Sequence, residues 1–206
     1  EEPDQLLALK KQLEENKYDL IVAEHQKDES RIWPFNNAEH SHLLNASDTS
    51  VLFVGHHKWL KNGNVITAIE TQEDTKSHRT FNNEIIEKSN DFAKLLMSDI
   101  HLFDCYLENC SVAFQEVYSN TEFKNHLKSL TSLVKAYHFE DKFLHVEEGL
   151  ADDVIPSQAS KYNANVVIMG CGEHKGLLSK IKGHTIDYVL DKLECDLLAL
   201  KQSSLH

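Results

Sequence analysis

The sequence contains few of the residues that mark specialised folds, with four cysteines, three prolines and seven glycines in 206 residues. The cysteines form no CxxC pair and no disulfide-framework spacing, so reduced thiols in a cytosolic protein are expected. No apolar run approaches the roughly 20 residues that a membrane-spanning helix needs. No signal-peptide pattern is present either. These absences predict a cytoplasmic protein without a membrane segment.

Positive charge is also scarce, because 21 basic residues stand against 33 acidic ones and give a formal net charge of −12. A surface this acidic repels phosphate backbones and anionic membranes, and no basic patch is large enough to reverse that repulsion. We therefore expect neither a nucleic-acid partner nor a membrane partner. The hydrophobic content of 41% is typical of a globular protein with a packed core.

Motifs for catalysis and metal binding are missing as well. There is no GxSxG nucleophile motif, and the 13 histidines show neither HExxH nor paired Cys/His spacing. Histidines at i and i+2, as in His40 and His42, do not share a helix face. Cys171 is either a modestly reactive thiol or a small loop residue, and we favour the second reading. The sequence predicts no catalytic site and no metal site.

Strand and helix patterns alternate along the whole chain. Continuous or alternating apolar runs predict strands at 19–23, 51–54, 64–69, 100–107, 143–147, 165–169 and 196–200. Apolar spacing predicts helices at 4–17, 38–45, 80–97, 121–139, 151–162 and 183–192, with an irregular connector at 108–120. Pro156 lies inside the fifth of these helices and predicts a kink or a later start. Residues 64–201 thus predict an α/β fold with a five-stranded parallel sheet, covered by helices on both faces.

An internal repeat appears when the chain is shifted by 146 positions. Residues 19–23 then align with 165–169, and residues 48–54 align with 194–200, with matching apolar positions. We interpret residues 1–55 as the C-terminal part of a first domain, 56–63 as a linker and 64–201 as a complete second domain. Because two strands alone cannot close a core, we expect the first part to pair edge to edge with the second through strands 51–54 and 196–200.

A glycine-punctuated loop follows the strand at 165–169 and leads into a helix. Such a loop lets the backbone approach a phosphate, and the helix N-terminus offers free N–H groups. The candidate ligand residues there are Gly170, Gly172, Glu173, Gly183, His184 and Thr185. Glu173 argues against a triphosphate because like charges repel. The alternative reading is that the glycines only shape the turn.

A further candidate, Glu70, ends the first strand of the complete domain. Ligands in open α/β sheets bind at the carboxyl ends of strands near the switch point, so Glu70 could contact a ribose or a base. A solvated acid in a turn is an equally good reading of the same residue.

The complete domain resembles the universal stress protein family, whose fold is a five-stranded parallel α/β sheet. The nucleotide-binding members carry Gly, two residues, Gly, nine residues, Gly and then Ser or Thr after the fourth strand. That frame falls on Gly170, Glu173, Gly183 and His184, so the first and third glycines match and the other two positions depart. The run from Gly149 to Pro156 and the 195–198 ending look most like a tandem bacterial type of the family.

The resemblance implies a cytoplasmic stress-response protein that is not a catalyst and that pairs with itself through edge strands, as a dimer or pseudo-dimer. Our leading hypothesis is that its nucleotide-binding loop is degenerate and that no cofactor is bound. The alternative is a switch that binds ATP, AMP or another small ligand through the loop from Gly170 to Thr185. Weak hydrolysis at the same loop ranks last, because no metal-binding carboxylate or general base accompanies it.

Overall fold

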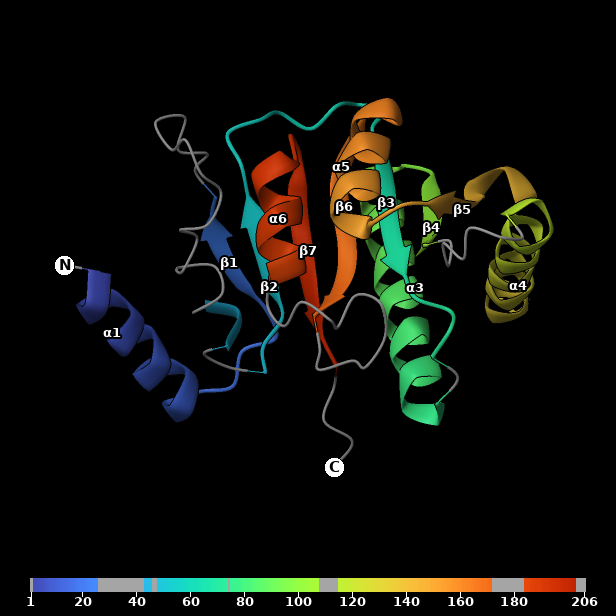
Figure 1. The fold of residues 1–206 in the computed structure, drawn as a ribbon. Coiled ribbons are helices and arrows are strands. Elements are labelled where there is room, and N and C mark those ends of the chain that lie inside the picture. Colours follow the sequence, from blue (N-terminus) through green and yellow to red (C-terminus); the bar gives the residue numbers. More distant parts are fainter. Residues whose placement is uncertain are drawn as a thin grey trace.

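The computed structural model describes residues 2–25, 43–45, 48–73, 75–107, 115–171 and 184–202. One mixed sheet forms the centre of the molecule, with the strand order β1-β2-β7-β6-β3-β4-β5 (Figure 1). Its strands are β1 (Ile21–Glu24), β2 (Val51–Val54), β3 (Asn64–Ile69), β4 (Ile100–Tyr106), β5 (Leu144–Glu148), β6 (Ala164–Cys171) and β7 (Asp196–Lys201).

The α/β class is confirmed, but the sheet has seven strands and not the five predicted for it. Residues 64–201 supply β3 to β7, and neighbouring strands in this set are all parallel. The two extra strands, β1 and β2, are parallel to each other and join the same sheet through β2. Short apolar strands behave this way because their unpaired edges are stabilised by continuing an existing sheet.

Helices cover both faces of the sheet. The helices with described bounds are α1 (Glu2–Glu15), α3 (Lys76–Leu96), α4 (Gln115–Val134), α5 (Ala151–Lys161) and α6 (His184–Lys192), with a 3₁₀ turn, η2, at Asp141–Phe143. α5 and α6 lie on one face and α3 lies on the other (Figure 1). None of the described helices is long and apolar enough to cross a membrane.

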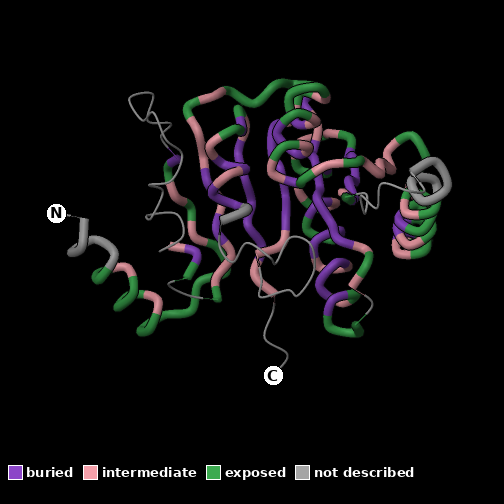
Figure 2. Tube along the Cα trace, viewed as in Figure 1, coloured by how far each residue is buried: buried purple, intermediate pink, exposed green. Residues whose placement is uncertain are grey.

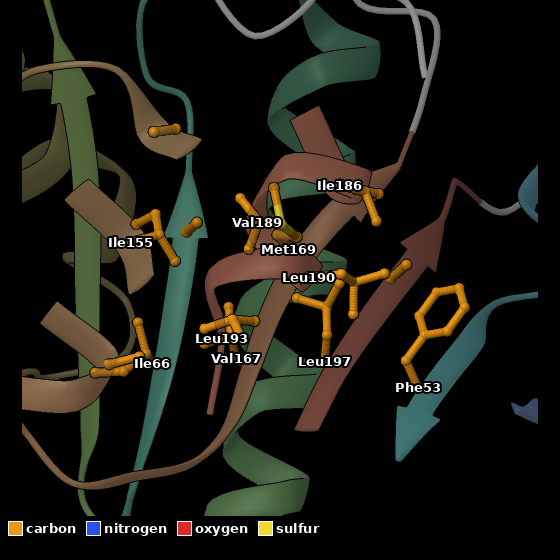
Figure 3. Close-up of a cluster of buried hydrophobic side chains, with 14 of the residues drawn as sticks. Phe53, Ile66, Ile155, Val167, Met169, Ile186, Val189, Leu190, Leu193 and Leu197 are labelled. Carbon is orange, nitrogen blue, oxygen red and sulfur yellow. The ribbon is translucent and has the colours of Figure 1, made fainter. Parts of the chain in front are cut away.

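Two apolar cores result, one on each face. The first joins α5 and α6 to the sheet, and ten of its side chains are labelled in Figure 3. Ile155 of α5 and Leu190 of α6 are almost fully buried in it. The second core packs α3 and α4 on the opposite face, around Phe81, Ile86 and Leu130. A fully buried side chain of this size contributes about 1.5–3 kcal/mol to the stability of the fold. With one core on each face, the central strands are buried on both sides.

Helix boundaries differ from the prediction where capping decides them. α3 begins at Lys76 and not at residue 80, because the Thr75 hydroxyl accepts a hydrogen bond from the N–H of His78 and caps the helix. α4 runs from Gln115 to Val134, so the predicted range 121–139 was shifted toward the C-terminus. Beyond the end of the helix, His138 adopts a positive φ of 57°, which a continued right-handed helix would not allow.

Pro156 lies in the middle of α5 and neither delays nor ends the helix. A proline removes the N–H that would bond the carbonyl four residues earlier, here that of Asp152. The ammonium group of Lys192, at the end of α6, donates to that same carbonyl at 3.2 Å and also to the Asp153 carboxylate. A neighbouring helix thus satisfies the backbone acceptor that the proline leaves open.

The seam between β2 and β7 is antiparallel and confirms the predicted edge-to-edge pairing. Val51 lies opposite Ala199, and Phe53 lies opposite Leu197. The N–H of Lys201 donates to the Ser50 hydroxyl, and the N–H of Gly55 donates to the Asp196 carboxylate, both at 3.0 Å. Hydrogen bonds therefore close both ends of the seam.

The segment 56–63, predicted as a linker, is tied to the start of two strands. The indole N–H of Trp59 donates to Asp196 at 2.7 Å, and the side-chain amide of Asn165 exchanges two hydrogen bonds with the backbone of Leu60. By contrast, the side chains of α1 that the structure describes are exposed or half-buried, as the tube in Figure 2 shows. Leu7 of α1 is 67% exposed and Val22 of β1 is 64% exposed, so this edge of the molecule shows apolar surface.

Candidate functional site

The carboxyl ends of β6, β3 and β4 meet at one edge of the sheet. β3 lies between β6 and β4, and the chain leaves β3 toward β4 but returns to its other side as β6. This is a topological switch point, the place where open α/β sheets bind ligands. The predicted candidates Glu70 and Gly170 both lie at this edge.

Glu70 follows the last residue of β3 and is only 9% exposed. Its main-chain carbonyl accepts two hydrogen bonds from α3, from the His78 ring at 2.7 Å and from the Asn82 side-chain amide at 2.8 Å. The reading of Glu70 as a solvated turn acid is therefore wrong. Because α3 fixes the backbone here, the position of the Glu70 carboxylate at the sheet edge is restricted.

Gly170 is a glycine for reasons of packing. A Cβ atom at this position would lie 2.6 Å from Cε1 of Phe81 and 3.1 Å from Cδ1 of Ile85, both on α3. Such distances are too short for a methyl group, so any side chain would force α3 away from the sheet. The first glycine of the predicted phosphate loop thus has a structural explanation that needs no ligand.

Not all of the other candidate residues of the loop are among those that the structure describes. Gly172, Glu173 and Gly183 lie outside the described residues. His184 and Thr185 form the first turn of α6, and their side chains lie outside what is described. Their roles as ligand contacts remain predictions.

Three polar residues that the sequence did not single out meet beside this edge. Asp104, in the second half of β4, is fully buried and lies under α4. Its Oδ2 accepts a 2.5 Å hydrogen bond from the Thr71 hydroxyl and a 2.8 Å hydrogen bond from Nδ1 of His126. We call Thr71, Asp104 and His126 the aspartate cluster. The signal for it in the sequence was a single acid in a strand that is apolar apart from His101.

The cysteines near the edge are poor nucleophiles. Burial raises the pKa of Cys105 to about 12, and the carboxylates of Asp104 and Glu147 add to the rise. Burial also raises the pKa of Cys171, although the nearby Lys201 opposes the shift. Both groups stay protonated at neutral pH, and a thiol reacts far more slowly than a thiolate. The structure favours the reading of Cys171 as a small structural residue.

A histidine pair bridges the amino-terminal ends of β4 and β5, away from the edge described above. Nδ1 of His101 and Nε2 of His145 are 2.9 Å apart, and the rings of Phe103 and Tyr162 pack against them. Burial lowers the pKa of both rings, to about 4 for His145, where His101 and Lys161 lower it further. Within the described ranges, no group of three His, Cys, Asp or Glu side chains is arranged to hold a metal ion.

Comparison with known proteins agrees with the fold. Residues 111–201 match the model of the Universal stress protein family. The chain is 28% identical over 206 residues to a Universal stress protein E homolog of Haemophilus influenzae, which covers 95% of this chain and 66% of the relative. It is 26% identical over 168 residues to Universal stress protein E of Escherichia coli K12, which covers 78% of this chain and 53% of the relative. These similarities support the universal stress protein family for this chain.

Solved structures support the same fold. A functionally unknown protein from Pseudomonas aeruginosa PAO1 superimposes with a TM-score of 0.76 at 27% identity, over 96% of this chain and 67% of that one. A universal stress protein from Archaeoglobus fulgidus superimposes with a TM-score of 0.61 at 14% identity, over 96% of this chain and 65% of that one, which indicates a shared fold. The chain spans about half to two thirds of the length of its curated relatives.

Proposed function

We propose that this chain is a non-catalytic, cytoplasmic stress-response protein of the universal stress type with a degenerate nucleotide-binding loop. The observation that carries the proposal is the contact between Phe81 and Gly170, because it accounts for the first glycine of the phosphate frame by packing alone. The two frame positions that depart from the nucleotide-binding pattern are Glu173 and His184.

Charge supports the same reading. A triphosphate carries several negative charges, and Glu173 adds another at the position where a backbone N–H should approach the phosphates. The formal net charge of −12 adds a long-range repulsion that salt only partly screens. The free energy of binding ATP is therefore expected to be unfavourable relative to that of family members with an intact loop.

Isothermal titration calorimetry with ATP and Mg²⁺ tests this proposal on the whole chain. We expect no saturable heat at micromolar ligand concentrations. A dissociation constant in the micromolar range would overturn it.

We further propose that residues 1–55 are the C-terminal part of a first universal stress domain, that 56–63 link the two, and that 64–201 form a complete second domain. Adding 146 to each partner in the β1–β2 register gives the β6–β7 register, so the pair Ile21 and Val51 corresponds to Val167 and Leu197. This agreement is independent of sequence identity and supports a repeat.

The two hydrogen bonds that close the seam support the repeat as well. Shifting Ser50 and Gly55 by 146 positions gives Asp196 and Lys201, which are the partners at the other end. Each unit therefore donates an N–H at the C-terminal end of its last strand to a side chain at the N-terminal end of the last strand of the other. Two copies related by a twofold axis give this pattern, and the seam serves as the pseudo-dimer contact.

A second candidate function is a switch that binds a small ligand, with ATP or AMP as the ligands considered from the sequence. The aspartate cluster favours a ligand at the strand ends, since a buried acid with polar neighbours at a switch point is typical of binding sites. Mass spectrometry of small molecules released when the purified protein is denatured would test it. Release of a stoichiometric nucleoside or nucleotide is the expected result, and an empty supernatant after native purification would contradict it.

A further inference from the structure

A groove of about 420 Å³ opens at the amino-terminal ends of β4 and β5, away from the edge that carries Glu70 and Gly170. It lies between the end of α3 and the segment that leads from α4 into β5. The buried side chains of Ala93 and Ile100 contribute to its lining. None of the candidate ligand residues predicted from the sequence lines this groove, so it is a separate site.

Three aromatic side chains line the groove. Tyr137 and Phe139 have ring centroids 6.5 Å apart and planes inclined at 52°, and both pack against the second core. The Tyr137 hydroxyl also donates to the side-chain oxygen of Asn83 at 3.2 Å. Phe143 joins them from the residue before β5. Because packing and a hydrogen bond hold these rings, the groove is already formed in the folded chain.

Met97 places an apolar side chain on the α3 side of the groove. It is 88% exposed, and as the C-cap residue of α3 it has a positive φ of 52°. Glycine is the usual residue in this conformation, because a Cβ atom raises its energy. His138, which also lines the groove, has a positive φ of 57°. Residues held in such conformations cluster at binding sites, so the groove is a candidate for function.

The charges around the groove favour a positively charged ligand. The carboxylates of Asp99 and Glu140 are offset by Lys94, by the ring of His138 and by Lys142, which pairs with Glu140 at 3.0 Å. Because these side-chain charges nearly balance, weaker fields decide the sign. α3 and α4 both end beside the groove, and the C-terminus of a helix carries a partial negative charge. The formal net charge of −12 also attracts cations.

One ring of the groove already contacts a cation. Nζ of Lys142 lies over the Phe143 ring, 4.7 Å from its centroid. An ammonium group in this position is attracted by the negative face of the ring. No described lysine or arginine lies over Tyr137 or Phe139 in the same way. These two rings thus offer aromatic faces to a cation from solution.

We propose that this groove binds a small organic cation, which consists of an ammonium group on an apolar body. The ammonium group lies against Tyr137 and Phe139 near Asp99, and the apolar body contacts Met97. Aromatic faces beside carboxylates determine this chemical class. The ligand needs neither a phosphate nor a base, so the inference is independent of the glycine loop and of the aspartate cluster.

Phenylbutylamine, phenylbutanol and phenylbutyrate test the charge selectivity, because they place a positive, a neutral and a negative group on the same apolar body. We expect the full chain to bind the amine at least about fivefold more tightly than the alcohol, since only the ammonium gains cation–π and carboxylate contacts. The carboxylate probe should bind more weakly than the alcohol, because the field of the groove repels it.

The two methionines of the chain report where the probes bind. Met97 is exposed in the groove, whereas Met169 is 2% exposed in the first core, on the other face of the sheet. In protein with isotope-labelled methionine methyl groups, the amine should shift the Met97 NMR signal in a saturable manner. The Met169 signal should stay in place, and it also shows that the core of each variant is intact.

Two substitutions test the assigned contacts. Asp99→Asn removes the carboxylate, and Phe139→Leu removes an aromatic face but keeps an apolar side chain. Each should lower the amine-to-alcohol affinity ratio at least about twofold. Asp48→Asn and Phe123→Leu are the matched controls, because both side chains are exposed and neither lines the groove. The controls should leave the ratio unchanged.

Each result decides the proposal. If no probe shifts the Met97 signal, the groove is not a binding site and the proposal is wrong. Equal affinities for the three probes would show selection for apolar surface and not for charge, which also overturns it. A ratio that survives both Asp99→Asn and Phe139→Leu contradicts the assigned contacts. Should Phe139→Leu move the Met169 signal and so disturb the core, the result with Asp99→Asn decides alone.

Discussion

Leu52 of β2 lies opposite Leu198 of β7, and the two residues are equivalent in the proposed 146-residue repeat. They occupy the centre of the antiparallel seam, so a twofold axis passing between them relates the flanking pairs to each other. The pairs Val51 with Ala199 and Phe53 with Leu197 exchange places under that rotation. The seam has the geometry of a homodimer contact formed within one chain.

The first prediction concerns the hydrogen bonds that close the seam. Ser50→Ala removes one neutral acceptor and should cost about 1 kcal/mol of the free energy of unfolding. Asp196→Ala should cost about 2–4 kcal/mol, because it leaves the N–H groups of Gly55 and Trp59 unpaired. Urea unfolding measures both, with the exposed Ser157→Ala as the control. Equal effects of the two seam variants would contradict this account.

The second prediction concerns the proline in α5. Lys192→Met should lower the free energy of unfolding by about 1 kcal/mol, because the carbonyl of Asp152 loses its donor. Pro156→Ala restores a backbone N–H for that carbonyl, so Lys192→Met should cost less in the Pro156→Ala background.

A double-mutant cycle in urea measures this coupling. Asp153→Asn serves as the control, since it weakens only the exposed ion pair with Lys192, and such pairs contribute little. A coupling energy of zero would show that Lys192 does not act through the carbonyl.

The third prediction tests the packing role of Gly170. Gly170→Ala should destabilise the protein by about 1–3 kcal/mol, because the added methyl group overlaps the Phe81 ring. Phe81→Leu shortens that side chain, so the double variant should be more stable than the sum of the two single effects predicts. Thermal unfolding followed by circular dichroism gives the values. If Gly170→Ala leaves the stability unchanged, packing does not explain this glycine, and the phosphate-binding hypothesis gains support.

The fourth prediction concerns pH. The pKa of His145 is lowered to about 4 in the folded protein, chiefly by burial, and lies near 6.5 when unfolded. Between these values the unfolded state binds more protons, so stability falls as the pH drops from about 6.5 to 4 and is fully present above 6.5. Allowing for solvent screening at a half-buried ring, we expect a loss of about 1–2 kcal/mol.

Urea unfolding at a series of pH values checks this dependence. His145→Gln cannot gain the proton and should flatten the profile over that window. His56→Gln is the matched control, because His56 is exposed and its nearest acid is Glu24 on the surface. An unchanged profile in the His145→Gln protein would assign the acid sensitivity to other groups.

The fifth prediction restores the phosphate frame. Glu173→Gly together with His184→Ser recreates the spacing of the nucleotide-binding members, so ATP binding should become measurable by calorimetry. Glu173→Gln with His184→Ser removes the same charge but keeps a Cβ atom, and should gain less. If neither double variant binds ATP, residues other than Glu173 and His184 also prevent the loop from binding it.

The fold was predictable where local patterns are strong. The apolar runs around Val51 and Leu197 identified both strands of the seam, and the repeat indicated that they pair. The bounds of α4 were missed because its first turns contain scattered apolar residues without a clear period. The start of α3 depends on one capping hydroxyl, that of Thr75, which helical periodicity does not reveal.

The candidate site was less predictable, and the reason is distance along the chain. Thr71, Asp104 and His126 come from a loop, a strand and a helix, so no fixed spacing joins them. A motif search finds residues that act in a continuous segment, and here the contacts form only after the sheet is assembled. The same applies to Lys192, whose bond to Asp152 connects two helices.

The antiparallel seam also sets the directions in which the two halves of the sheet point. β1 and β2 run against β6 and β7, so their carboxyl ends lie on opposite rims of the molecule. Whatever binds beyond Glu24 approaches from the side opposite to a ligand beyond Gly170. The two rims lie on opposite sides of the molecule, and one continuous sheet connects them.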